Sequence, residues 1–125
     1  MKITNIKFKA ENIQFYIEDE VCVVAFADSQ DPDPEQYLIL SQTLFDSEPD
    51  NPEENIEIGI ETRQTSTFGK IEFINLESNE IVLDAIDSEA MKFHVAIQFT
   101  KAPQGLKDHL KILLFRSPEI AARLK

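Results

Sequence analysis

Apolar and polar residues alternate with a period of two along most of this chain, the pattern of strands that bury one face. In the N-terminal part the pattern predicts strands over 3–8, 13–17, 21–27 and 37–41, although 37–41 is apolar enough to form a short buried helix instead. Segment 21–27 is apolar at nearly every position, so we predict a central strand that is covered on both faces.

The rest of the chain predicts a loop, further strands and a change of period near the end. In order these are a loop over 45–55, a strand over 56–63, a turn over 65–69, a hairpin of strands 70–76 and 80–86, a strand over 91–99, and helices over 106–114 and 118–124. The prolines of 45–55 and the small polar residues of 77–79 are typical of loops and turns. Four leucines on one helical face indicate that the first helix is amphipathic.

Several consecutive strands followed by helices indicate an α+β fold. We predict one domain over residues 1–125, a mostly antiparallel sheet of six to eight strands. A C-terminal amphipathic helix would pack on one face of this sheet, and a short final helix would begin at Ser117-Pro118. The apolar fraction of 42% and nine Phe are sufficient for a substantial core.

Charge is distributed very unevenly along the chain. Between Lys9 and Arg63 there are fifteen Asp and Glu and no Lys or Arg, whereas residues 101–125 carry six basic and two acidic residues. The formal net charge is −11. The electrostatic field of this acidic chain attracts cationic partners and repels nucleic acid and anionic membranes. We therefore expect neither nucleic acid nor a membrane as a partner.

The sequence favours a cytoplasmic location. Its start lacks the apolar stretch of a signal peptide, and no segment approaches the length of a membrane span. The single cysteine, Cys22, excludes an intramolecular disulfide, and we expect a buried, unreactive thiol.

Signals of catalysis are weak. His94 and His109 read as surface or boundary residues, and there is no Gly-x-Ser-x-Gly motif or Gly-rich phosphate loop. The acidic segment 28–35 lacks the central Gly of an EF-hand loop and contains two prolines, so we expect a solvated loop with at most weak cation binding. We therefore predict no catalytic residues, no cofactor and no metal site.

Certain segments resemble a known family. The run Val-Ala-Phe-Ala-Asp over 24–28, the run Tyr-Leu-Ile-Leu-Ser-Gln over 37–42, the sequence Glu-Thr-Arg-Gln over 61–64 and the turn glycine Gly69 resemble immunity protein ten, a family of bacterial polymorphic toxin systems. The resemblance covers about Val21 to Phe115, mainly through the order of elements. Thr43 stands where we expect Arg in this family, and Phe68-Gly69 where paired glycines are frequent.

The resemblance implies an immunity protein that binds and neutralises a cognate toxin, as a monomer or homodimer. The acidic charge fits a basic, nucleic-acid-targeting toxin. We expect Tyr37 or Phe68 to anchor the partner, because aromatic residues supply much of the binding energy at interfaces. The residues expected to steer it are Asp31, Asp33, Glu35, Glu57 and Glu61. Two alternatives remain open: an enzyme of unknown reaction that uses a small ligand or metal at His94, and an adaptor that oligomerises through an exposed strand.

Overall fold

The computed structural model describes residues 3–44 and 57–124. Its elements, in chain order, are β1 (Ile3–Lys9), β2 (Asn12–Glu18), β3 (Val21–Ala27), β4 (Tyr37–Thr43), β5 (Ile58–Thr62), β6 (Ser66–Leu76), β7 (Glu80–Asp87), β8 (Lys92–Gln98), α1 (Leu106–Leu113) and α2 (Pro118–Ala121). Neither described helix is long and apolar enough to cross a membrane.

The eight strands form one mixed sheet in the order β1-β8-β7-β6-β5-β4-β3-β2. Six of the seven strand pairs are antiparallel, and β1 pairs with β8 in parallel. The coarse prediction, an α+β fold dominated by a sheet, is therefore correct. The parallel pair was not predicted, because alternation gives the faces of a strand but not its neighbours.

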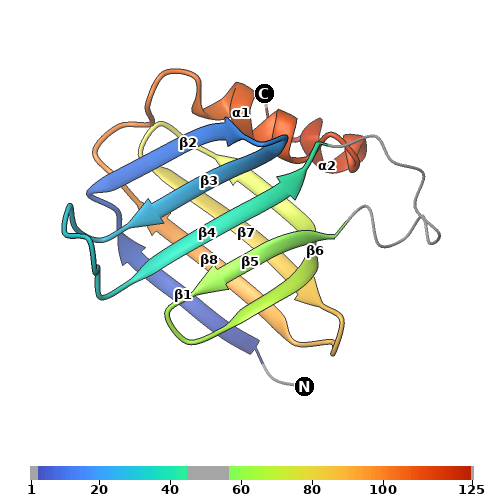
Figure 1. Ribbon diagram of the computed structural model, residues 1–125, viewed down its shortest axis with the longest axis horizontal. Helices are drawn as coiled ribbons and strands as arrows, with labels where there is room; N and C mark the ends of the chain where they lie inside the picture. The colour runs from blue at the N-terminus through green and yellow to red at the C-terminus, as the bar shows by residue number, and fades with distance from the viewer. Residues whose placement is uncertain (1–2, 45–56, 125) are drawn as a thin grey trace.

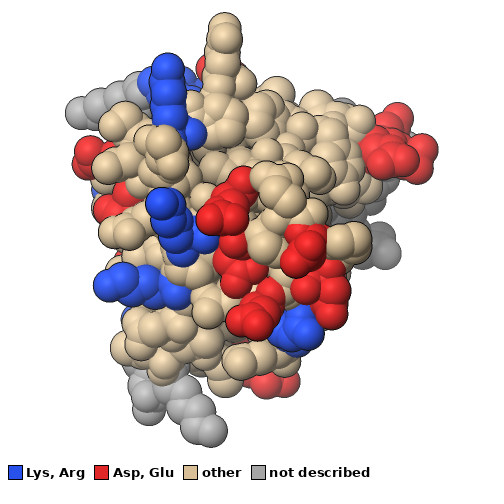
Figure 2. All heavy atoms as spheres, turned by 90° about the vertical axis from the view of Figure 1, so that its left-hand side faces the viewer, with Lys and Arg blue, Asp and Glu red and all other residues tan. Residues whose placement is uncertain are grey.

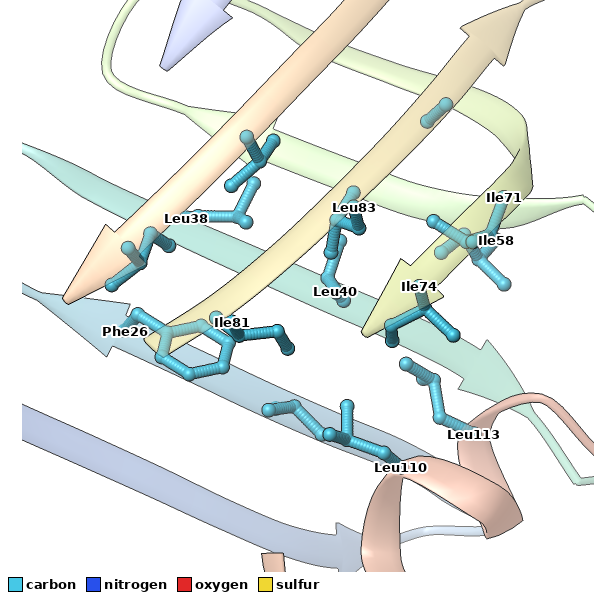
Figure 3. Packing of buried hydrophobic residues seen from close by; sticks show 14 of the residues in the cluster. Phe26, Leu38, Leu40, Ile58, Ile71, Ile74, Ile81, Leu83, Leu110 and Leu113 are labelled. Atoms are coloured by element: carbon cyan, nitrogen blue, oxygen red, sulfur yellow. The ribbon is translucent and has the colours of Figure 1, made fainter. Parts of the chain in front are cut away.

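The sheet is strongly curled, and its two halves face each other. Figure 1 shows β2, β3 and β4 crossing in front of β7 and β8, with β6 linking the two halves at the right. Alternate residues of the strands meet in the space between the halves and form one apolar core. In Figure 3, Phe26, Leu38 and Leu40 from one half lie opposite Ile81, Leu83 and Ile74 from the other.

The two edges of the sheet are formed by the first two strands, which a short corner joins. At this corner the Ala10 amide donates to the Gln98 carbonyl (2.7 Å) and the Glu11 amide donates to the Ala27 carbonyl (2.9 Å). The corner thus ties the ends of β8 and β3 together.

Both helices lie at one rim of the curled sheet (Figure 1), where α1 contacts β2 and β3 and α2 contacts β6. Leu106, Leu110 and Leu113 of α1 are buried in the same core as the strands. The predicted amphipathic helix is therefore present, but it is two turns long and closes the rim rather than covering a whole face. The second helix ends at Ala121 rather than Leu124.

Two predictions about the strands are wrong. In β3 the residues Cys22, Val24 and Phe26 are fully buried, but the alternate residues are only half-buried, so the strand is covered on one face. The predicted turn over 65–69 begins earlier, with Thr62 donating its amide to the Thr65 carbonyl (2.8 Å). Gly69 lies inside β6, where a Cβ atom would come within 2.6 Å of the Ile86 carbonyl oxygen.

The other predicted strands are confirmed with small shifts of their ends. Segment 37–41 is a strand, β4, and not a helix. The hairpin around 77–79 is formed by β6 and β7, with a bulge between Ile71 and Phe73. The predicted loop over 45–55 lies outside the described residues.

Candidate functional site

Strands β2 to β5 and the first half of β6 present a continuous outer surface, which we call the β2–β6 face. The strand register aligns Tyr16, Val23, Ser41, Gly59 and Phe68 in one row across these five strands. Tyr16 and Phe68, at the two ends of this row, leave 44% and 64% of their surface exposed. The two exposed aromatic rings, with the small residues Val23, Ser41 and Gly59 between them, give this face exposed apolar surface that a partner can cover.

The next row of the β2–β6 face ends in a hollow. It aligns Gln14, Ala25, Ile39 and Glu61. A hollow of about 480 Å³ lies at this row, between the strands and the loop after β3. We call it the acidic hollow; its lining includes Ala25, Ile39, Tyr37, Glu61, Asp31 and Asp33. Its volume falls within the range of about 300–1,000 Å³ that is typical of ligand pockets.

The loop over 28–36, which forms one wall of the acidic hollow, is held in place at its neck. There the Asp28 amide donates to the Gln36 carbonyl (3.0 Å), and the Gln36 amide donates to Asp28 Oδ2 (3.1 Å). The Gln30 side chain donates to the Glu11 carbonyl (2.7 Å), which ties the loop to the corner between β1 and β2. The carboxylates of this loop are therefore presented by an ordered backbone.

Arg63, which follows β5, also binds the loop over 28–36. Its Nη1 donates to Asp33 Oδ1 (3.0 Å) and to the Pro34 carbonyl (2.7 Å). The hydrogen bond and charge of Asp33 raise the pKa of Arg63 above its ordinary value, so this cation stays charged. Nearby, the Tyr37 hydroxyl donates to Glu61 Oε2 over 3.5 Å, a long bond that leaves this carboxylate able to accept others.

Acidic and basic side chains are separated on one side of the molecule. Figure 2 shows the side of the molecule with the 28–36 loop, where carboxylates gather on one half and most Lys and Arg side chains on the other. Glu18, Asp19 and Glu20 lie at the turn between β2 and β3, at the opposite end of these strands from the acidic hollow. The apolar centre of the β2–β6 face is thus bordered by carboxylates at both ends.

The predicted site residues are only partly brought together. Asp31, Asp33, Tyr37 and Glu61 all line the acidic hollow. Glu35 is exposed on the same loop but does not line the hollow.

Glu57 and Phe68 lie elsewhere on the β2–β6 face. Glu57 precedes β5, about 13 Å from Glu61 in an extended strand, so the two carboxylates belong to different ends of the face. Phe68 is not a turn residue but lies in β6 opposite Gly59. Two further carboxylates, Glu72 and Asp84, line a different hollow together with His94.

Sequence reasoning predicted the aromatic residues Tyr37 and Phe68 but missed the apolar centre of the site. The prediction that segment 21–27 is covered on both faces placed Ala25 in the core, and neither Ile39 nor Tyr16 was predicted as a site residue. The available signal was the apolar run of β3, whose outward residues Val21, Val23, Ala25 and Ala27 form the centre of the β2–β6 face. A strand that is apolar on both faces but covered on only one leaves an apolar surface for a partner.

A second hollow, of about 420 Å³, lies on the outer face of the other half of the sheet. His94 projects outward from β8, as predicted, and its Nδ1 lies 2.6 Å from Asp84 Oδ1. Glu72, Lys92 and Phe73 also line this hollow. The described residues that line it supply an acid–base pair but no cysteine or serine nucleophile beside it.

His109 and Cys22 form a partly buried contact between α1 and the sheet. The Cys22 Sγ lies 3.3 Å from His109 Nε2, and this nitrogen is 3.1 Å from the carbonyl oxygens of both Tyr16 and Val23. A ring N–H that donates to these carbonyls fixes α1 against β2 and β3. Burial raises the pKa of the Cys22 thiol to about 11, which suppresses its reactivity as expected.

No group of three or more His, Cys, Asp or Glu within residues 3–44 and 57–124 has the arrangement of a metal site. No protein-family model matches this chain, and no curated protein matches it.

Proposed function

We propose that this protein is a binding protein that neutralises a basic partner by covering it with the β2–β6 face. The partner that best fits the sequence resemblance is a cognate toxin that acts on nucleic acid. One observation carries the proposal: an apolar, aromatic-flanked surface is bordered at both ends by carboxylates. Protein interfaces have the same organisation, with an apolar centre and a polar rim.

The charge of this surface supports a cationic partner in particular. No Lys or Arg occurs in the sequence between Lys9 and Arg63, a stretch that includes β2 to β5. Asp33 neutralises Arg63, the cation next to the acidic hollow. Such a surface accelerates association with a basic cleft and disfavours nucleic acid, so the inhibitor would compete for the cleft without binding its substrate.

The experiment is co-purification of this protein with the product of the neighbouring gene, followed by measurement of association rates at several salt concentrations. We expect a stoichiometric complex whose association rate falls as salt increases. In the double variant Asp31→Lys and Glu61→Lys, the association rate at low salt should fall by about tenfold or more, with a weaker dependence on salt.

A matched control variant distinguishes the effect of where the reversed charges lie from the effect of the change in net charge. Glu77 and Glu89 are exposed residues of turns outside the β2–β6 face. The double variant Glu77→Lys and Glu89→Lys makes the same change in net charge and should leave the association rate within about twofold. Equal losses in both double variants would reduce the proposal to a general charge effect, and the absence of any complex would reject it.

A second candidate function rests on the hollow beside His94. The pair of His94 and Asp84 has the geometry of a general base with its orienting carboxylate, and the hollow is large enough for a small ligand. Screening a small-molecule library by thermal shift with wild-type protein and His94→Ala tests this candidate. A ligand that stabilises only the wild-type protein would favour it over the binding protein.

A further inference from the structure

The acidic hollow has the features of a receptor for one cationic side chain. Its floor is apolar, formed by Ala25 and Ile39, and the Tyr37 side chain forms part of its wall. The carboxylates of Asp31 and Glu61 lie at its border. An apolar floor receives a hydrocarbon stem, while an aromatic ring and two carboxylates receive its charged end.

The carboxylates of the hollow differ in whether they are already paired. Asp33 is bound by Arg63. Among the described residues, neither Asp31 nor Glu61 takes part in an ion pair, and the long bond from Tyr37 occupies only one oxygen of Glu61. Asp28, at the neck of the same loop, adds a buried oxygen, Oδ1, that lacks a hydrogen-bond partner among the described residues. The negative charge beside the hollow is thus only partly compensated.

The loop already shows how it binds a guanidinium group. Arg63 contacts it through one carboxylate and one backbone carbonyl, the arrangement of several acceptors around one planar cation. No Lys or Arg is among the described residues that line the hollow, so a guanidinium group bound there would come from a partner.

We propose that the acidic hollow binds an arginine side chain of the partner protein, a refinement that rests on the proposed function. Its guanidinium group pairs with Glu61 and Asp31 and packs against the ring of Tyr37. Arginine suits the hollow better than lysine, because a planar guanidinium group both stacks on an aromatic ring and donates two parallel hydrogen bonds to a carboxylate. The partner's arginine thereby fixes the end of the interface that lies farthest from the turn between β2 and β3.

The test uses isolated protein and small probes, so it does not require the partner. Protein labelled with ¹⁵N is titrated with N-acetyl-arginine methylamide, its lysine counterpart, and the citrulline compound, which is a neutral isostere of arginine. We expect saturable shifts of the Ala25, Ala27 and Tyr37 amide signals with arginine, weaker shifts with lysine and none with citrulline. Shifts of equal size with citrulline, or shifts spread over the whole protein, would overturn the inference.

Single-residue variants test whether the shifts of the amide signals arise from binding in the hollow. Glu61→Gln and Asp31→Asn should each weaken arginine binding by about two- to fivefold, as expected for solvent-accessible ion pairs. Tyr37→Phe should retain binding because it keeps the ring, whereas Tyr37→Ala should reduce it. Glu18→Gln removes an equal charge at the other end of β2 and should leave binding unchanged; the inference fails if it has the same effect as Glu61→Gln.

The two experiments distinguish rejection of the arginine inference from rejection of the proposed function. If arginine does not bind the hollow but the partner still co-purifies, only the arginine inference is rejected. If arginine binds the hollow but no protein partner is recovered, the proposed function is rejected and the hollow is a site for a different guanidinium compound.

Discussion

Replacement of Phe68 by alanine tests whether the β2–β6 face carries binding energy. Phe68 leaves 64% of its surface exposed, and a fully buried aromatic side chain covers roughly 150–250 Å². A partner that covers Phe68 completely would therefore bury roughly 100–160 Å² of additional apolar surface. At about 25 cal/mol per Å², the substitution costs at most roughly 2.4–4 kcal/mol of binding free energy. This corresponds to about two to three powers of ten in affinity.

Phe68→Ala should have little effect on stability, because most of the Phe68 side chain is exposed and it is not part of the core. The free energy of unfolding should change by no more than about 1 kcal/mol. Affinity for the co-purified partner is measured by calorimetry, and stability by urea denaturation. Phe115→Ala is the matched control, since Phe115 is 43% exposed but lies after α1, away from the β2–β6 face. Unchanged affinity for Phe68→Ala would refute the placement of the interface, as would an equal loss for Phe115→Ala.

Two further predictions concern the scaffold. Gly69→Ala should lower the free energy of unfolding by about 1–3 kcal/mol, because its Cβ would lie 2.6 Å from the Ile86 carbonyl oxygen and 3.1 Å from the Asp87 Cα atom. At Gly59 the closest atom is the rotatable Ser41 Oγ, so urea denaturation should show a smaller loss for Gly59→Ala. The raised pKa of Cys22, about 11 against an ordinary value of 9.0, means that above pH 9 the unfolded chain loses this proton before the folded chain does. Stability should therefore fall between about pH 9 and 11, by about 2–3 kcal/mol, and a Cys22→Val variant should lack this part of the fall in a pH series of denaturation curves.

The strands could be predicted because each buries one face, which imposes alternation on the sequence. β5 and β8 show this clearly, with buried residues at every second position. Strand order could not be predicted, since the pairing of Ile3 with Lys92 leaves no local signal. Gly69 was assigned to a turn because glycine is frequent there, but it is needed where β6 approaches the β7 backbone closely.

The candidate site was predictable through its charges and through two aromatic residues, Tyr37 and Phe68. Asp31, Asp33, Glu61 and Tyr37 were singled out from the acidic stretch, and the fold brings them to one hollow. Ala25 escaped prediction, because an apolar residue in a strand is normally interpreted as core. Deciding which of the two faces of β3 is covered requires the position of the strand in the sheet.

The two edge strands of the sheet, β1 and β2, are consecutive in the chain, and this affects the order in which the strand pairs form. β2 to β6 pair with their neighbours in sequence, so the whole β2–β6 face can assemble from contacts between successive strands. β1 precedes the other described strands, but it pairs with β8, the last of them. Closing this pair requires a very large loop, which makes such contacts slow to form. The surface assigned to the partner is therefore the part of the molecule that can take shape earliest, while the first strand must wait for the last.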